Sequence, residues 1–181
     1  MDEEKGRAPD RNPVKALHLK LSVADVRVRE ASCEDAHAVS GLITSLSRRF
    51  IIPQCTKEGA RKLLAASSTE SIKENMRKGF RYHVAEGEGR VVGVVGMEDN
   101  RHVYHLFVDT SVQKRGLGRR LFQVAREAAL AAGGSGEFTV NSSNYAVGFY
   151  ARLGFRRRWG PLMKNGVPTS MMVRREEGEV A

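Results

Sequence analysis

Apolar and polar residues alternate in the first stretch of the chain that has a regular period. Val26 and Val28 alternate with arginines, which is the period of a half-buried strand, and this predicts a strand over 25–30. The period becomes helical after Ser32, which has Asp35 at the spacing of a capping box. The apolar face of this predicted helix consists of Val39, Leu42, Ile43 and Leu46.

Two shorter helical stretches follow Pro53, which breaks the first pattern. Periodicity predicts helices over 56–67 and 69–78, and Gly79 ends the second. The side chains expected to face inward are Leu63, Leu64, Ile72 and Met76.

The middle of the chain changes from the helical period to the period of strands. We expect strands over 81–86, 90–98 and 102–108, separated by turns at Gly87-Glu88-Gly89 and Asp99-Asn100. Strands joined by such short turns predict an antiparallel meander.

The helical period returns over 117–131, and Gly133-Gly134 stops it. A short strand follows over 137–140. Asn144 can then cap a last helix, which Gly154 closes. The residues expected to face inward are Leu117, Leu121, Val124, Ala125 and Ala128 in the first helix, and Ala146, Phe149, Tyr150 and Leu153 in the second.

A predicted hairpin ends the pattern. Segments 155–163 and 168–174 flank Asn165-Gly166, a pair that tolerates the positive φ angles of a tight turn. The order of the elements predicts a mixed α/β or α+β fold in which helices cover one sheet. This order alone does not decide the function.

The sequence has more basic than acidic residues. The chain of 181 residues fits one domain, and its 30 Lys and Arg against 21 Asp and Glu give a formal net charge of +9. This charge favours a polyanionic partner, such as nucleic acid, an anionic membrane or a phosphorylated cofactor. Cys33 and Cys55 form no CxxC or Cys/His cluster, so we expect no disulfide framework, no zinc site and a reduced, cytoplasmic protein.

The two ends of the chain lack a steady period. Residues 1–22 contain Pro9, Pro13 and mixed charge, so we expect a flexible leader there, and a flexible tail at 176–181. No apolar segment of signal-peptide type follows the charged start, and no stretch approaches about 18 uninterrupted apolar residues. Secretion and membrane spanning are therefore not expected.

The turn after the strand 102–108 has the clearest chemistry. Gly116 and Gly118 lie where this strand leads into the helix 117–131, among four basic residues: Lys114, Arg115, Arg119 and Arg120. The unpaired amides and the positive dipole of a helix N-terminus attract anions, and glycines let phosphate oxygens approach the backbone. A P-loop is excluded because no GxxxxGK precedes Ser or Thr, and a dinucleotide fingerprint because Leu121 stands where a third glycine is needed. A solvated basic turn without a ligand is the simpler alternative.

This turn resembles the coenzyme A motif of the GNAT superfamily of acetyltransferases, Gln/Arg-x-x-Gly-x-Gly/Ala. It reads Gln113-Lys-Arg-Gly116-Leu-Gly118. The family also has a later Asn, an Ala two residues on, and a Tyr in a helix that ends Leu-Gly-Phe. The matching residues are Asn144, Ala146, Tyr150 and Leu153-Gly154-Phe155. The resemblance extends over roughly 25–175 and implies one GNAT-like domain at 23–175, with a central, mixed, mostly antiparallel twisted sheet of about six to seven strands and helices on both faces.

The resemblance implies an acyl-CoA-dependent N-acyltransferase, with acetyl-CoA as co-substrate and an amine of a small molecule or peptide as acceptor. The acyl-pantetheine arm would lie in a V-shaped opening between the strand 102–108 and the next parallel strand. Backbone groups of Phe107 and Val108 would hold this arm, and Asn144 would hydrogen-bond it. The coenzyme-binding turn implied by the motif comprises Gln113, Lys114, Arg115, Gly116, Leu117, Gly118 and Arg119.

Two side chains are the candidates for proton transfer. Tyr150 matches the family's helix tyrosine, and a phenol of pKa about 10 can protonate a leaving thiolate of pKa about 8.5. The alternative is that Tyr150 is an aromatic residue of the core with no part in catalysis. His102 falls where a glutamate base often sits, and a pKa near 6.5 suits proton removal at neutral pH. Strand alternation predicts His102 and Tyr104 on one face and His105 on the other; His105, Glu98 or an ordered water are the alternative bases.

Two other classes of function stay open. The charge of +9, with Arg156-Arg157-Arg158 beside Trp159, would suit a nucleic-acid-binding module, although no helix-turn-helix, zinc-finger or RNA-recognition signature is present. A coenzyme A-binding sensor that has lost catalysis is the other alternative: the missing glutamate favours it and Tyr150 opposes it. No metal motif or nucleophilic serine motif occurs. We expect no membrane partner, and a homodimer stays open.

Overall fold

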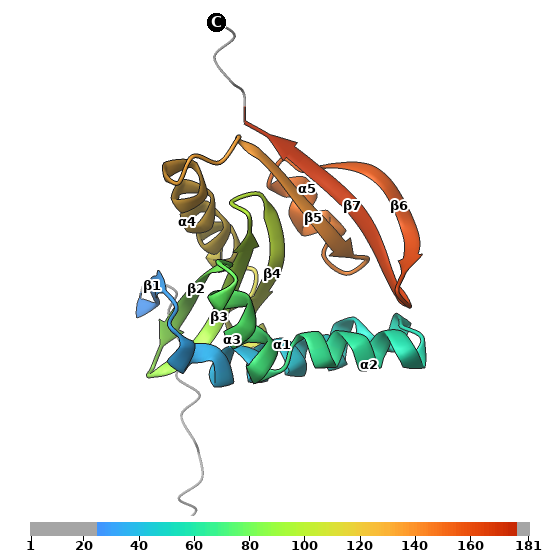
Figure 1. Ribbon diagram of the computed structural model, residues 1–181, viewed down its shortest axis with the longest axis horizontal. Helices are drawn as coiled ribbons and strands as arrows, with labels where there is room; N and C mark the ends of the chain where they lie inside the picture. Colours follow the sequence, from blue (N-terminus) through green and yellow to red (C-terminus); the bar gives the residue numbers. More distant parts are fainter. Residues whose placement is uncertain (1–24, 177–181) are drawn as a thin grey trace, which may run out of the picture.

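One seven-stranded sheet forms the centre of the computed structural model, which describes residues 25–176 (Figure 1). The strand order is β1-β2-β3-β4-β5-β7-β6, and β4 with β5 is the parallel pair in this described part. The predicted mixed, mostly antiparallel sheet is therefore confirmed. The leader expected at 1–22, and 177–181 of the expected tail, lie outside the described residues. The strands are β1 (Arg27–Glu30), β2 (Arg81–Gly87), β3 (Arg90–Glu98), β4 (His102–Val108), β5 (Glu137–Ser143), β6 (Arg156–Lys164) and β7 (Val167–Arg175).

Helices cover both faces of this sheet, as predicted. α1 and α3 pack on one face, called the α1 face below, and α4 and α5 pack on the other, called the α4 face. Ile43 and Ile72 lie in the core of the α1 face, and Leu121 and Phe138 in the core of the α4 face. The helices are α1 (Ala36–Phe50), α2 (Lys57–Ala66), α3 (Thr69–Arg77), α4 (Leu117–Ala131) and α5 (Val147–Arg152).

The side chains expected to face inward are buried or packed against the core in α1, but two other helices differ. Leu63 and Leu64 of α2 are only half-buried, because α2 runs past α1 toward the β6–β7 turn (Figure 1). In α4 the buried stripe includes Phe122, and Val124 lies at its margin. The period predicted these helices correctly, but the width of each buried stripe depends on what packs against it.

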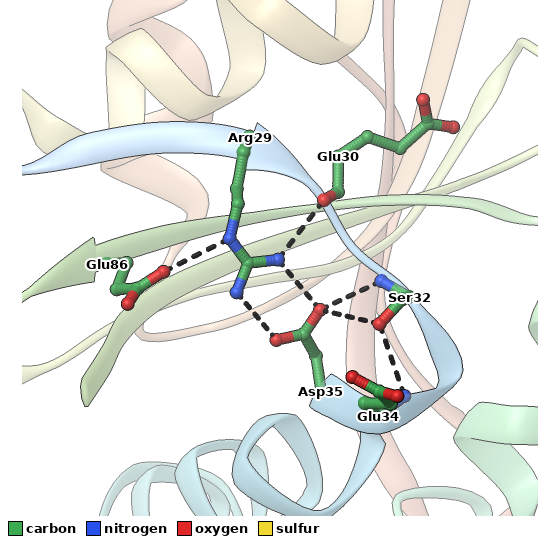
Figure 2. Close-up of polar contacts among 6 residues, drawn as sticks. All are labelled: Arg29, Glu30, Ser32, Glu34, Asp35 and Glu86. Atoms are coloured by element: carbon green, nitrogen blue, oxygen red, sulfur yellow. Dashed lines mark hydrogen bonds and ion pairs between the residues drawn. The ribbon is translucent and has the colours of Figure 1, made fainter. Parts of the chain in front are cut away.

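The start of α1 is tied to the sheet by polar contacts around Arg29 (Figure 2). The predicted capping box is confirmed: Ser32 Oγ accepts from the Glu34 amide at 3.3 Å, and Asp35 Oδ2 accepts from the Ser32 amide at 2.8 Å. Arg29 donates to the Asp35 carboxylate at 2.8 and 2.9 Å and to Glu86 Oε2 on β2 at 3.1 Å. This capping box closes the 3-10 turn Cys33–Asp35, which leads into α1. The bonds from Arg29 lower the pKa of Asp35, so its carboxylate stays ionised.

The β6–β7 turn contacts the first turn of α2 through two glycines. Asn165 and Gly166 have φ angles of 51° and 80°, which confirms the predicted tight turn. The Thr56 amide donates to the Gly166 carbonyl oxygen at 2.9 Å, and a Cβ on Gly59 would lie 2.2 Å from that same oxygen. Gly59 therefore allows two backbones to approach more closely than any side chain would permit.

Replacing Gly59 by alanine is expected to force α2 away from the β6–β7 turn and to lower stability by about 1–3 kcal/mol. Thermal denaturation followed by circular dichroism measures the change as a fall in Tm of several degrees. The matched control is Gly41→Ala in α1, where nothing lies within 4 Å of the added Cβ and alanine favours the helix by about 0.5–1 kcal/mol. Equal Tm values for the two variants would contradict the contact.

Candidate active site

A V-shaped opening separates β4 from β5. The two parallel strands pair only near their starts, at His102↔Thr139 and Val103↔Val140. Beyond Val140, β5 continues to Ser143 with β7 as its partner, while β4 stays paired with β3. Figure 1 shows the two strands diverging from this point. The geometry has the form that the resemblance implied for an extended ligand arm.

A β-bulge at Tyr104 changes the facing of the β4 side chains. Gly96 pairs with His105 and Met97 with Val103, so Tyr104 is the extra residue. The prediction that His102 and His105 face opposite sides is therefore wrong. His105 contacts the core of the α1 face, and His102 reaches the same face through its bond to a β5 side chain described below.

At alternate residues of β4, the backbone N–H and C=O groups point into the opening. The Asp109 amide donates to the Val92 carbonyl at 2.9 Å and so faces β3. Because neighbouring residues of a strand direct their backbone groups to opposite sides, Val108 faces the opening and Phe107 faces β3. In the opening, Gln113 Nε2 donates a hydrogen bond to the Val108 carbonyl oxygen at 2.8 Å. Of the two predicted backbone sites, the structure directs Val108 into the opening; by the same alternation Leu106, which sequence reasoning missed, also faces it.

The turn after β4 leads to an uncapped helix start. Lys114 has a φ angle of 61° and Gly116 of 90°, and Gly116 is the N-cap of α4. The first amide of α4 that bonds back is Arg120, to the Gly116 carbonyl at 3.0 Å. Gly116 has no side chain to cap the helix, so the amides of 117–119 find no acceptor among the described residues. These unpaired amides, beside exposed Lys114, lie where the sequence predicts that an anion binds.

The first turn of α4 packs closely on α5. A Cβ on Gly118 would lie 3.0 Å from Phe149 Cε2, so glycine lets the two helices meet at the opening. Arg119 is exposed and its Nη2 reaches the Arg152 carbonyl at 3.5 Å. Arg120 turns away, since its Nη1 donates to the Val26 carbonyl at 2.8 Å. Arg119 is therefore the better placed of these two cations for a ligand at the helix start.

Tyr150 lies on α5 in the core of the α4 face. Its ring meets Phe149 and Phe155 edge-on, with centroids 5.3 and 5.4 Å apart. Only 5% of the residue is exposed. Its hydroxyl has no hydrogen-bond partner within residues 25–176, yet it is not among the fully enclosed polar atoms. Burial raises the pKa of Tyr150 well above its ordinary value, so the phenol keeps its proton at neutral pH.

Comparison with known proteins decides the family. The family described as the acetyltransferase (GNAT) domain matches residues 51–175 of this chain. The chain belongs to the GNAT acetyltransferases. The search of curated proteins found no match.

Solved structures show the same GNAT fold. A GCN5-related N-acetyltransferase from Rhodopseudomonas palustris is 20% identical, with a TM-score of 0.71 over 86% of this chain and 98% of that one. The PaiA N-acetyltransferase of Thermoplasma acidophilum, in complex with coenzyme A, is 13% identical, with a TM-score of 0.67 over 83% and 99%. The N-acetylglutamate synthase of Neisseria gonorrhoeae, complexed with coenzyme A and N-acetyl-glutamate, is 20% identical, with a TM-score of 0.60 over 83% of this chain and 35% of that one.

His102 of this GNAT domain is held at the apex of the opening. Because an amide nitrogen can only donate, His102 Nε2 accepts from Asn141 Nδ2 at 3.4 Å, and Nδ1 donates to Thr139 Oγ1 at 2.8 Å. Burial lowers the pKa of His102, and the charges of Lys164 and Arg101 add to this effect. The imidazole is therefore neutral at pH 7. Its unprotonated nitrogen is Nε2, which accepts only the long hydrogen bond from Asn141 and can take up a proton.

His105, the alternative base, belongs to a closed network. Asn75 Nδ2 donates to Tyr82 Oη at 3.3 Å, so the Tyr82 hydroxyl donates to His105 Nδ1 at 3.0 Å. Burial lowers the pKa of His105 to about 3. With Nδ1 occupied by a buried tyrosine, His105 is a structural acceptor, and His102 is the better candidate.

Contacts of the residues that follow β5 with the segments after α1 and β4 were missed by sequence reasoning. Phe50 stacks on Tyr145 with centroids 4.4 Å apart, and Tyr145 Oη donates to Gln113 Oε1 at 3.2 Å. Asn144 Nδ2 donates to Gln54 Oε1 at 3.1 Å. The N-cap of α5 is Ala146, so the prediction that Asn144 caps this helix is wrong. Asn144 instead joins the end of β5 to the segment after α1.

The described part of the domain lacks two further features. Between residues 25 and 176, no three His, Cys, Asp or Glu side chains gather as a metal site would require. In that same range, no helix has the length and apolar character needed to cross a membrane.

Proposed function

We propose that this GNAT domain transfers an acetyl group from acetyl-CoA to a primary amine by direct attack of the amine on the thioester. The observation that carries the proposal is the opening between β4 and β5, which leads to the uncapped start of α4. Structural neighbours from Thermoplasma acidophilum and Neisseria gonorrhoeae hold coenzyme A, which supports the same co-substrate here.

The residues present fit a coenzyme with a pyrophosphate. Amides of 117–119 would bind its oxygens, and the open space around Gly116, where nothing lies within 4 Å of an added Cβ, leaves room for them. Lys114 and Arg119 would add positive charge. Val108 would offer backbone groups to the pantetheine arm after Gln113 releases its carbonyl. Phe107 faces β3, so its part would be packing rather than bonding.

Three protons move in this transfer. His102 Nε2 would take the proton of the acceptor ammonium, so that the amine nitrogen can form a C–N bond with the thioester carbon. Backbone amides of β4 that face the opening would stabilise the oxyanion. The C–S bond then breaks, and the Tyr150 hydroxyl would give its proton to the leaving thiolate. As the amide forms, its nitrogen loses a second proton, which solvent would carry back to the Tyr150 oxygen. His102 would release its own proton to solvent between turnovers.

Calorimetric titration with acetyl-CoA, followed by an assay of thiol release with a panel of amines, tests the proposal. We expect micromolar binding of acetyl-CoA and amine-dependent release of coenzyme A. If the folded protein does not bind acetyl-CoA, the proposed function is wrong.

Substituting His102 by glutamine is expected to lower kcat/KM about 100-fold, because glutamine cannot take a proton. Since the pKa of His102 is lowered below its ordinary value, the wild-type kcat/KM should rise with pH below about 6.5 and level off above it. The variant should lose this rise. His83→Gln is the control: burial also lowers the pKa of His83, but it lies on β2, away from the opening. An unchanged pH profile in His102→Gln would remove His102 from the mechanism.

A further inference from the structure

A large groove lies beside the candidate active site, over the starts of β5 and β6 and the end of β7. Its volume is about 1240 Å³, and its lining includes Thr139, Trp159, Met171 and five arginines. Pockets for small molecules are usually smaller, about 300–1,000 Å³. The groove is therefore large for a small amine alone.

The lining of the groove carries a net positive charge, and some of its arginines have no acidic partner in the described residues. Five arginines against two glutamates give +3 for its lining. Both glutamates are engaged: Glu137 pairs with Arg101 and Arg175, and Glu176 pairs with arginines of α4 and β7. By contrast, the side chains of Arg156–Arg158 make no ion pair or hydrogen bond within residues 25–176. Trp159, which follows them, is 42% exposed.

The groove reaches the proposed base through Thr139. Thr139 lines the groove and accepts the hydrogen bond of His102 Nδ1. It pairs across the sheet with Val173, which pairs in turn with Arg156. Two strand spacings, about 10 Å, thus separate Thr139 from Arg156, and an extended peptide covers that distance in about three residues.

We propose that the groove binds an acidic polypeptide segment whose lysine or N-terminal amine is the acceptor; this rests on the proposed function. Carboxylates within about three residues of the amine would meet Arg156–Arg158, and apolar side chains would pack on Trp159. Nucleic acid would also satisfy the arginines, but the amines of its bases are conjugated with aromatic rings and are poor nucleophiles. The transfer chemistry therefore favours the peptide.

Trp159 supplies a direct test, because it is the single tryptophan of the sequence. The probe is a short peptide with one lysine among aspartates, and the matched control peptide has asparagine at each aspartate. We expect the acidic peptide to change the tryptophan emission, with an affinity that falls as salt is added. The triple variant R156Q/R157Q/R158Q should bind it about tenfold more weakly. The control variant R61Q/R77Q, changed on α2 and α3, should bind as the wild type does.

Each outcome bears on one proposal. An equal response to both peptides, or none to either, overturns the groove proposal, as does a single-stranded oligonucleotide that binds more tightly than the acidic peptide. In the thiol-release assay, faster acetylation of the acidic peptide, lost in the triple variant, supports the proposal; equal rates overturn it. If acetyl-CoA fails to bind while the emission response persists, the transferase function fails and the groove's peptide binding stands.

Discussion

Replacing Gly118 by glutamate is expected to abolish acetyl-CoA binding, with a loss of affinity of at least about 100-fold, or roughly 3 kcal/mol. The position lies in the first turn of α4, whose amides of 117–119 face the proposed pyrophosphate site. A carboxylate there would repel the phosphates and occupy the amides that should bind them. Calorimetric titration with acetyl-CoA measures the change.

The control for this variant must separate charge from crowding. Any Cβ at Gly118 would lie 3.0 Å from Phe149 Cε2, so Phe149 must move by a few tenths of an ångström. Gly118→Ala makes the same demand without the charge, and it should keep most of the affinity. If folded Gly118→Glu protein binds acetyl-CoA as tightly as the wild type, the coenzyme does not bind at this helix start.

Local patterns in the sequence were sufficient for most elements of the fold. α4 spans Leu117–Ala131, the same range that the helical period and the flanking glycines predicted. The turn at Asn165 and Gly166 also followed from local chemistry, because positive φ angles select these residues. Such features depend on a few neighbouring residues, so they can be predicted from a single sequence.

The bulge at Tyr104 is a feature that strict alternation could not predict. Its trace in the sequence is the separation of three positions between Val103 and Leu106, two apolar residues that both contact the core of the α4 face. A period of two requires an even gap, so one extra residue must lie between them. The consequence reaches the site, because the bulge places His102 and His105 on the same face.

Side-chain partners in the site depend on contacts distant in sequence. Asn144 bonds to Gln54, 90 residues earlier, instead of capping α5. Gln113 lies in the predicted motif, but its amide group braces Val108 and Tyr145 rather than the helix start. A motif thus predicted where the site lies, whereas the direction of each side chain was decided by tertiary packing.

Replacing Tyr150 by phenylalanine is expected to lower kcat about 100-fold and to leave the affinity for acetyl-CoA unchanged, because phenylalanine keeps the packing and loses the proton donor. The Tyr150 hydroxyl has no hydrogen-bond partner within the described residues, so its removal should not lower Tm. Steady-state kinetics of thiol release, with calorimetry and thermal denaturation, measure the three quantities.

Tyr82→Phe is the matched control, since its hydroxyl is bonded to both Asn75 and His105. Losing these bonds should lower stability by about 1–2 kcal/mol and leave turnover close to wild type. The two tyrosines are both buried, and burial raises the pKa of each, so burial alone cannot separate their roles. A buried phenol that is bonded inside the protein stabilises the fold, whereas one without an internal partner is free to serve a ligand. Unchanged kcat in Tyr150→Phe would show that its ring, and not its hydroxyl, is the reason for its place in α5.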